Sequence, residues 1–312
     1  MTYLKNALPG FRLAVVYDIA MMAVPRVLAI AFVLIAASPL CVIAQTDNPL
    51  LARGEYVLRI SGCSHCHTSE NGEHLAGGRA LETPFGTFYT PNITSHKTAG
   101  IGAWSADEFA RALHQGIAPD GSDYYPAFPY TSYTRMSAED VRALHTYILS
   151  LPVSGQANRD HELAWFLRWR LAAWAWKWLF FNAGEFQARP EQSAQWNRGA
   201  YIAEAMGHCG ECHTPRNLFG ASNPDMAYAG NAEGPDDELV PNITPHEGTG
   251  LGDWGRDDLE LFLKYGEYPD GEYVAGSMDP VVEGLQNLTL DDRDALIDYI
   301  RALPAIENRI SK

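Results

Sequence analysis

The 312-residue sequence is short of cysteine, of basic residues and of long apolar runs, and each shortage excludes a class of protein. It has 5 cysteines. Cys41 belongs to a predicted leader and the other four to two paired motifs, so no disulfide framework is predicted. Lys and Arg number 23 against 38 Asp and Glu, and the net charge of −15 disfavours nucleic acid and favours docking to a basic patch on a protein. The sequence also lacks sustained strand alternation, a phosphate-binding loop and a Ser/His/Asp triad.

An uncharged, mostly apolar segment at residues 27–44 directly follows Arg26. It ends in "VIA", an A-x-A-like cleavage site, and therefore predicts a secretory signal peptide within residues 1–44. An uncleaved membrane anchor is the alternative, because about 18 apolar residues just span a bilayer. The leader is unusually long, so translation is expected to begin at Met21 or Met22. Both interpretations export the rest of the chain, which predicts a periplasmic protein, anchored to the inner membrane if the segment is kept.

The four remaining cysteines occur in two copies of one motif, C-x-x-C-H, at 63–67 and 209–213. Sulfurs at i and i+3 lie on one side of a helical turn, so both can form thioethers to one porphyrin while the following His ligates the iron. The pattern predicts two covalently bound haem c groups, attached through Cys63, Cys66, Cys209 and Cys212, with His67 and His213 as proximal ligands. A redox-active C-x-x-C pair and a zinc ion shared by both pairs are the alternatives.

The repeat extends beyond these motifs. "RGEY" (53–56) recurs as "RGAY" (198–201), "PNIT" (91–94) recurs at 241–244, and "PDG" occurs twice. Each copy predicts an opening helix before the motif, a short middle helix and a closing helix with a Ser or Thr N-cap, Ser137 or Thr289. This plan resembles the class I cytochrome c fold in both halves.

The expected architecture is therefore all-α, with two tandem class I cytochrome c domains at 45–153 and 197–312. A Trp-rich helical connector at 154–196 joins them, and its stretch at 161–181 holds five of the eight tryptophans. It is interpreted as a strap packed against both domains, or else as a membrane-interface helix or docking surface for a partner.

An electron-carrying haem usually needs a second axial ligand, commonly Met. Met278 lies in a loop before the second closing helix and is predicted to be that ligand in the second copy. Its repeat partner is Phe128, so Met136, directly before the Ser137 cap, is predicted for the first copy. A hydrophobic staple is the alternative role of Met136, with His114, His96 or an open iron then completing the first site.

Weaker predictions concern the haem propionates. Trp104 and Trp254, each in a "G-x-W" sequence, are candidate indole N–H donors, and Arg79 and Arg216 are candidate charge partners. The alternative for the two tryptophans is that they close the haem pocket by packing alone.

Several longer stretches, among them "YPAFPYTSYTRMSAEDVRALHTYI" and "GHCGECHTPRN", resemble the cytochrome c subunit of membrane-associated periplasmic dehydrogenases. These include alcohol, aldehyde and gluconate dehydrogenases and some molybdenum hydroxylases, and the resemblance covers about residues 50–304. It implies electron transfer from a catalytic subunit towards quinone, another cytochrome or a terminal oxidase. The usual subunit has three haem domains, whereas this sequence has two C-x-x-C-H motifs, so a two-haem version is expected. A free-standing periplasmic electron shuttle and a dihaem peroxidase are the alternatives.

Overall fold

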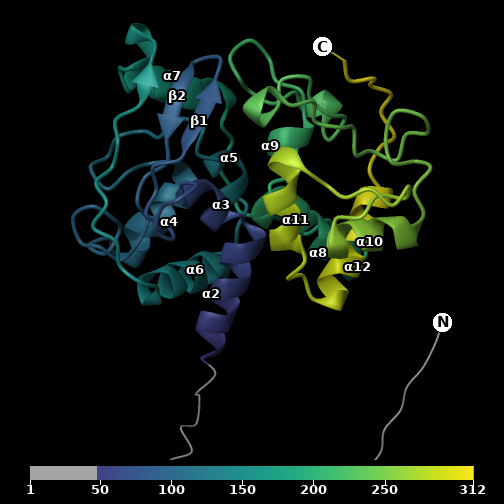
Figure 1. Cartoon of the computed structure of the whole chain (residues 1–312), viewed down its shortest axis with the longest axis horizontal. Coiled ribbons are helices and arrows are strands. Elements are labelled where there is room, and N and C mark those ends of the chain that lie inside the picture. Colours follow the sequence, from purple (N-terminus) through teal and green to yellow (C-terminus); the bar gives the residue numbers. More distant parts are fainter. Residues whose placement is uncertain (1–47, 312) are drawn as a thin grey trace, which may run out of the picture. The chain divides into compact units, whose positions relative to one another are not determined.

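The computed structural model describes residues 48–311, and Figure 1 shows them as a mainly helical molecule. The predicted leader, residues 1–44, lies outside this range, as does Cys41. Among the described helices, none combines the length and the apolar character needed to cross a bilayer.

The N-terminal half, here residues 48–160, has the predicted succession of helices. In chain order these are α2 (Pro49–Ile60), α3 (Cys63–His67), α4 (Ala106–Gln115), α5 (Tyr130–Tyr133) and α6 (Ala138–Ser150). The Ser137 hydroxyl accepts a hydrogen bond from the Asp140 amide at 3.2 Å, which confirms the predicted N-cap of α6. A capping box between Ser105 and Glu108 starts α4.

The C-terminal half, residues 193–311, repeats this order. Its elements are α8 (Ala194–Tyr201), η2 (Ile202–Met206), α9 (Gly210–His213), η3 (Pro224–Met226), η4 (Pro235–Asp237), α10 (Arg256–Tyr265), η5 (Gly276–Met278), α11 (Asp279–Leu285) and α12 (Leu290–Arg301). Thr289 caps α12 through the Asp292 amide, as predicted. The opening helix continues from α8 through η2, a π-helical turn, before the motif.

In each half, the opening helix packs closely against the closing helix at a glycine that occurs in both copies of the repeat. A Cβ on Gly54 of α2 would lie 2.2 Å from the Ala143 carbonyl oxygen of α6. A Cβ on Gly199 of α8 would likewise lie 2.0 Å from the carbonyl oxygen of Ala295 in α12. Since any side chain would separate these helices, glycine explains why "RG-x-Y" occurs in both copies.

A small antiparallel sheet corrects the all-α prediction. It consists of β1 (Ala80–Thr83), β2 (Gly86–Tyr89) and β3 (Glu162–Leu163), with β2 in the middle. The register pairs Ala80 with Tyr89 and Gly86 with Leu163. Strands of two to four residues are too short to give a periodic signal, which is why the sequence pattern did not reveal them.

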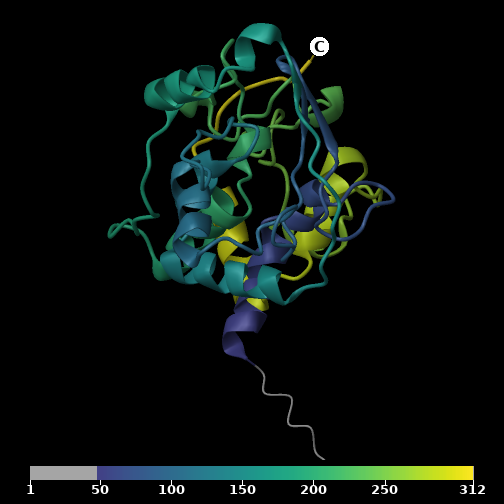
Figure 2. The same cartoon turned by 90° about the vertical axis from the view of Figure 1, so that its left-hand side faces the viewer.

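The connector is less helical than expected. After β3 it forms a short 3₁₀ turn, η1 (Trp165–Leu167), and then α7 (Leu171–Phe180), while residues 181–193 are irregular. Figures 1 and 2 both place α7 at the end of the molecule away from α2 and α6. Most of its large side chains are exposed. It nevertheless contacts both halves, because Lys177 pairs with Asp123 and the Trp176 indole donates to the Phe219 carbonyl at 2.8 Å, so the predicted strap role stays open.

The two halves exchange hydrogen bonds reciprocally through their opening and closing helices. Tyr56 of α2 donates to Asp292 of α12 at 2.5 Å, and Tyr201 of α8 donates to Asp140 of α6 at 2.5 Å. Each carboxylate also pairs with an arginine of its own half, Asp140 with Arg53 at 2.6 Å and Asp292 with Arg198 at 2.6 Å. These equivalent residues therefore form one connected polar cluster. The sequence pattern had placed the tyrosines on helix faces and the aspartates at helix caps, without predicting that they meet.

Candidate functional site

The first C-x-x-C-H motif forms the short helix α3, directly after α2. Gly62, with φ of 62°, turns the chain between the two helices. The thiols of Cys63 and Cys66 are free and partly buried. Burial raises the pKa of Cys63 to about 12 and raises that of Cys66, so both are thiols rather than thiolates at neutral pH.

His67 ends α3, and its ring is oriented by a backbone carbonyl. Its Nδ1 lies 2.7 Å from the Pro91 carbonyl oxygen and donates to it in the Nδ1–H tautomer. The other nitrogen, Nε2, then carries the lone pair that a metal requires. Burial lowers the pKa of His67, which favours this neutral form of the imidazole.

The second motif reproduces this arrangement around α9. Burial raises the pKa of Cys209 to about 12 and that of Cys212 to about 11. His213 Nδ1 lies 2.8 Å from the Pro241 carbonyl oxygen, and burial lowers the pKa of His213. The two sites therefore present the same set of groups, two thiols and one carbonyl-oriented neutral imidazole.

The repeated "PNIT" segments supply these carbonyls, a role that motif analysis missed although the repeat itself was visible. The Asn92 side chain accepts from the Thr94 amide at 2.9 Å and donates to the Ser154 carbonyl at 2.9 Å. Asn242 does the same with Thr244 and with the Ile306 carbonyl, at 2.9 and 2.8 Å. Each asparagine thus ties the loop that carries the orienting carbonyl to the chain leaving the closing helix.

Comparison with known proteins agrees with this geometry. The cytochrome c family model matches residues 51–152. A protein of Cereibacter sphaeroides named "Diheme cytochrome c-type" is 37% identical over 82% of this chain and 86% of its own length. The chain belongs to the cytochrome c family.

Other relatives of this cytochrome are named as subunits of dehydrogenases. The gluconate 2-dehydrogenase cytochrome c subunit of Pantoea cypripedii is 39% identical over 84% of the chain. The alcohol dehydrogenase (quinone) cytochrome c subunit of Gluconacetobacter polyoxogenes is 36% identical over 89% of the chain. The chain spans only 61% of the length of each of these two.

The family implies covalently bound haem c, and the groups at the first motif fit it. Haem attachment requires two thiols on one side of a turn and a neutral imidazole with a free nitrogen, which are the groups of Cys63, Cys66 and His67. Among residues 48–311, no three or more His, Cys, Asp and Glu side chains are grouped so that they could hold a metal ion by themselves. The zinc alternative therefore has no ligand set in the described part of the chain.

The two predicted axial methionines occupy different settings. Met278 ends η5, is partly buried and packs against the core just before α11. Met136 is fully buried and directly precedes the Ser137 cap. Leu288, which precedes the Thr289 cap, is buried in the equivalent position, so the packing role of Met136 stays open beside the ligand role.

The alternative ligands of the first site also differ from each other. His96 Nδ1 accepts the Ala99 amide at 3.0 Å and organises its own loop. Nε2 of His114, near the end of α4, is buried without a hydrogen-bond partner in the described structure. Phe128, the repeat partner of Met278, packs in an aromatic cluster with Tyr124 and Tyr133. Ligation by Met136 and Met278 stays a prediction.

The predicted propionate partners lie as follows. Trp104 and Trp254 are partly buried against the core, as either predicted role requires. Arg79 donates to the His65 carbonyl at 2.9 Å, and Arg216 donates to the Glu211 carbonyl at 2.7 Å. His65 and Glu211 are the second variable residues of their C-x-x-C-H motifs, so the two arginines make equivalent contacts. These contacts give both arginines a structural role, and their contact with propionates stays a prediction.

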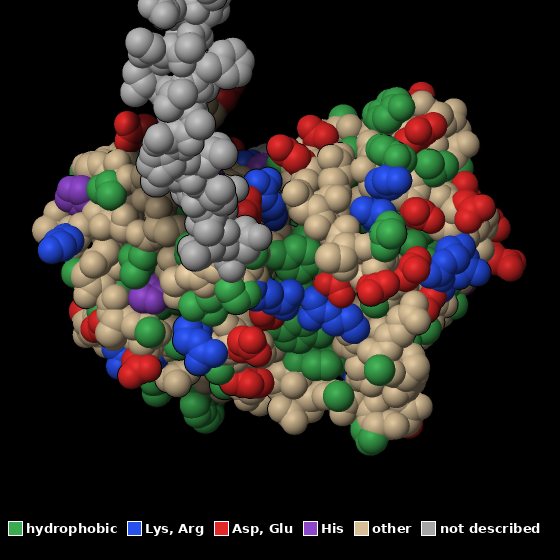
Figure 3. Space-filling view, turned by 90° about the horizontal axis from the view of Figure 1, so that it is seen from below, with side chains coloured by type: hydrophobic (Ala, Val, Ile, Leu, Met, Phe, Trp, Pro, Cys, Tyr) green, Lys and Arg blue, Asp and Glu red, His purple; other side chains and the backbone are tan. Residues whose placement is uncertain are grey.

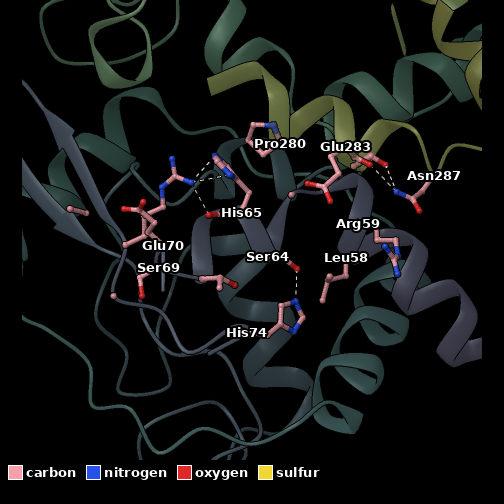
Figure 4. A pocket seen from close by; sticks show the side chains of 16 residues that line it. Leu58, Arg59, Ser64, His65, Ser69, Glu70, His74, Pro280, Glu283 and Asn287 are labelled. Carbon is pink, nitrogen blue, oxygen red and sulfur yellow. Dashed lines mark hydrogen bonds between the residues drawn. The ribbon is translucent and has the colours of Figure 1, made fainter. Parts of the chain in front are cut away.

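A cavity of about 880 Å³ lies beside the first motif (Figure 4). Its walls include Ser64 and His65 from α3 and Pro280, Glu283 and Asn287 from or beside α11. In Figure 4 His74 points towards Ser64, whose hydroxyl is 2.8 Å from its Nε2. The lining includes neither the cysteines nor the ligand histidine, and its residues from both halves place the cavity between α3 and α11.

The residues just before the two motifs contact each other directly, which sequence spacing had not indicated. His208, the residue before Cys209, has its Nε2 3.3 Å from the carbonyl oxygen of Ser61, two residues before Cys63. The Tyr133 hydroxyl donates to the same carbonyl at 3.2 Å, and its ring lies edge-on to His208 at 5.4 Å.

A buried carboxylate strengthens this contact. Glu211, inside the second motif, accepts hydrogen bonds from Thr131 and Ser132 of α5 at 2.5 and 2.7 Å. Burial raises the pKa of Glu211, but Arg216 and the two hydroxyls outweigh burial and hold it below its ordinary value. An ionised Glu211 therefore joins the second motif to the loop that leads to Met136.

Proposed function

We propose that this cytochrome carries two haem c groups and transfers electrons from the catalytic subunit of a periplasmic dehydrogenase to the respiratory chain. The names of the gluconate and alcohol dehydrogenase relatives support the kind of electron donor. The acceptor is a quinone, another cytochrome or a terminal oxidase. The chain itself contributes no catalytic residue to substrate oxidation.

The equivalence of the two motifs supports the second haem. Cys209, Cys212 and His213 repeat the burial, the protonation state and the carbonyl partner found for the first motif. The relative named as a dihaem cytochrome matches most of the chain and most of its own length. Two cytochrome c domains, at 45–153 and 197–312, joined by the connector at 154–196, account for both observations.

The single observation that carries the relay is the direct contact between the motifs. Haem c supplies Fe(III)/Fe(II) cycling when it is bound. Ser61 and His208 bring the two attachment turns together, and Tyr133 and Glu211 hold them there. This proximity of the two attachment turns supports a relay between them.

Purification of the native protein from membranes in a mild detergent tests the proposed partner. We expect a stoichiometric dehydrogenase catalytic subunit to co-purify, and its substrate to reduce both haems of the complex. A lone two-haem protein would contradict the subunit role and favour a free-standing shuttle.

A further inference from the structure

The connector presents a surface of large apolar side chains, here called the tryptophan surface. Its members are Trp165, Phe166, Trp169, Leu171, Trp174, Trp178, Leu179 and Phe180. The exposed fractions of its four tryptophans are 74%, 66%, 53% and 75% in chain order. We propose that the tryptophan surface lies in the interfacial layer of a lipid bilayer and holds the cytochrome flat against the membrane.

The cation of α7 faces the protein and most of its large apolar side chains face away. An ordinary surface helix instead buries its apolar face and exposes its charged one. The Lys177 ammonium is largely buried, where it pairs with Asp123 and donates to the Gly116 carbonyl at 2.9 Å. Ala173 is also buried, and the Trp176 indole donates to the Phe219 carbonyl at 2.8 Å. The helix is therefore fixed to the molecule by its cation and its one inward-facing indole, and the other tryptophans face out.

Two arginines fix the segment before α7 in the same way. Arg168 donates to the Leu163 carbonyl at 3.1 Å, and Arg170 donates to the Asp123 carbonyl at 3.1 Å with its guanidinium 4.8 Å from the Tyr125 ring. Both residues remain exposed beside Trp165 and Trp169. Tryptophan is enriched at membrane–water interfaces, and interfacial helices combine Trp, Phe and Leu with basic residues.

A second segment extends the same surface. The Phe219 ring stacks with that of Phe180 at 6.0 Å, and the neighbouring Leu218 is 95% exposed. An apolar side chain so fully exposed at a loop tip has no partner within the described chain to shield it from water. Exposed apolar side chains can insert into the interfacial layer of a bilayer without a matching pocket. The dominant side chains of a protein–protein interface are instead packed into pockets on the partner.

Charge also favours a membrane for this part of the molecule. Although the chain has a net charge of −15, residues 163–184 contain no Asp or Glu. The face in Figure 3, which is seen from below, instead has acidic and basic side chains interspersed. An anionic membrane surface would therefore meet no acidic side chain from this stretch of the connector.

The geometry sets the mode of binding. The 10 residues of α7 extend about 15 Å, against a hydrocarbon core of about 30 Å, so the helix can lie in the interface and cannot cross it. This binding is independent of the N-terminal segment and of the number of haems.

Hydrogen–deuterium exchange on the intact haem-loaded protein tests the proposal. We compare phosphatidylcholine vesicles, with and without phosphatidylglycerol, against buffer. We expect vesicles to protect peptides covering 165–181 and 217–220, more strongly with the anionic lipid. Protection confined to the N-terminal segment would overturn the proposal, and so would protection of the tryptophan surface by a purified catalytic subunit but not by vesicles.

A variant series gives the matched control. Trp169→Ser with Trp178→Ser and Leu218→Ser is expected to weaken vesicle binding by about tenfold or more and to abolish the local protection. Leu290→Ser removes a comparably exposed leucine from α12 and is expected to change neither. Equal binding of the two variants, both with intact haem spectra, would show that the tryptophan surface does not contact lipid.

Discussion

At the scale of single residues, backbone carbonyls determine how the two ligand histidines are presented. Pro91 and Pro241 accept from Nδ1 of His67 and His213, and buried asparagines hold the loops that carry these prolines. Orientation of a metal-ligating imidazole by a second hydrogen bond is a general feature of metal sites.

Asn242→Ala should therefore destabilise the protein. Loss of its bonds leaves the Ile306 carbonyl and the Thr244 amide without their partner, and the free energy of unfolding should fall by about 3 kcal/mol. Denaturant unfolding of the haem-loaded protein measures this. The control is Asn287→Ala, which alters an exposed asparagine, and an equal loss in both variants would contradict the assigned role.

The axial ligands can be separated from packing by a conservative change. Met136→Leu keeps an apolar side chain of similar volume, as Leu288 already provides in the second half, but removes the thioether. If Met136 ligates iron, the sulfur-to-iron charge-transfer band of one haem disappears and its reduction potential falls. Met278→Leu is expected to do the same for the other haem. An unchanged spectrum in Met136→Leu would assign Met136 to packing alone.

At the scale of helices, the reciprocal tyrosine–aspartate bonds connect the two halves. Tyr56→Phe and Tyr201→Phe should each lower the free energy of unfolding by about 2 kcal/mol, because each removes a hydrogen bond to a carboxylate that is buried or partly buried. Tyr265→Phe, on an exposed tyrosine of α10, provides the control. Thermal and denaturant unfolding measure these changes. If the variants were as stable as the control, the tyrosine–aspartate bonds would have no stabilising role.

The same cluster predicts a dependence of stability on pH. Burial raises the pKa of Asp292, but the bonds from Arg198 and Tyr56 outweigh it and hold the pKa below its ordinary value. This stability is present above the pKa of the unfolded chain, about 3.9 for an ordinary aspartate, and is lost as pH falls from there through the lower folded pKa. Asp292→Asn should be less stable at pH 7 and should lose less stability on acidification. If the free energy of unfolding of this variant fell with pH as steeply as that of the wild type, Asp292 would not be the source of the pH dependence.

Helix predictions succeeded where local signals agreed. The caps at Ser137 and Thr289 are local hydrogen bonds between residues three apart, and both were confirmed. The strands were missed because they are very short, and β3 forms only by pairing with the distant β2. The connector was predicted as a longer helix because its apolar composition does not reveal where a helix starts or ends.

At the scale of the whole molecule, the important feature is the contact between the two motifs. The repeat in the sequence predicted the two cysteine–histidine sets, but it contained no information on their separation. That contact depends on His208 and Tyr133, which lie outside the C-x-x-C-H motifs, and on Glu211, which occupies a variable position within one. Long-range pairs of this kind follow from tertiary packing, which periodicity and spacing do not encode.

His208→Ala should slow electron exchange between the two sites, because it removes the direct contact with Ser61. Flash reduction of the half-reduced protein, followed at both haems, measures the exchange. His74→Ala removes a histidine that bonds Ser64 of α3 rather than Ser61 or His208, and should leave the rate unchanged. Equal rates in the two variants and the wild type would exclude a role of His208 in the relay.

The most direct test of the account is the intact mass of the protein, secreted by a host that matures c-type cytochromes and then extracted with acidified acetone to remove unattached haem. We predict two covalently held haems in the wild type and one in each of the double variants Cys63→Ser/Cys66→Ser and Cys209→Ser/Cys212→Ser. A wild-type chain with one haem or none would contradict the two-haem relay.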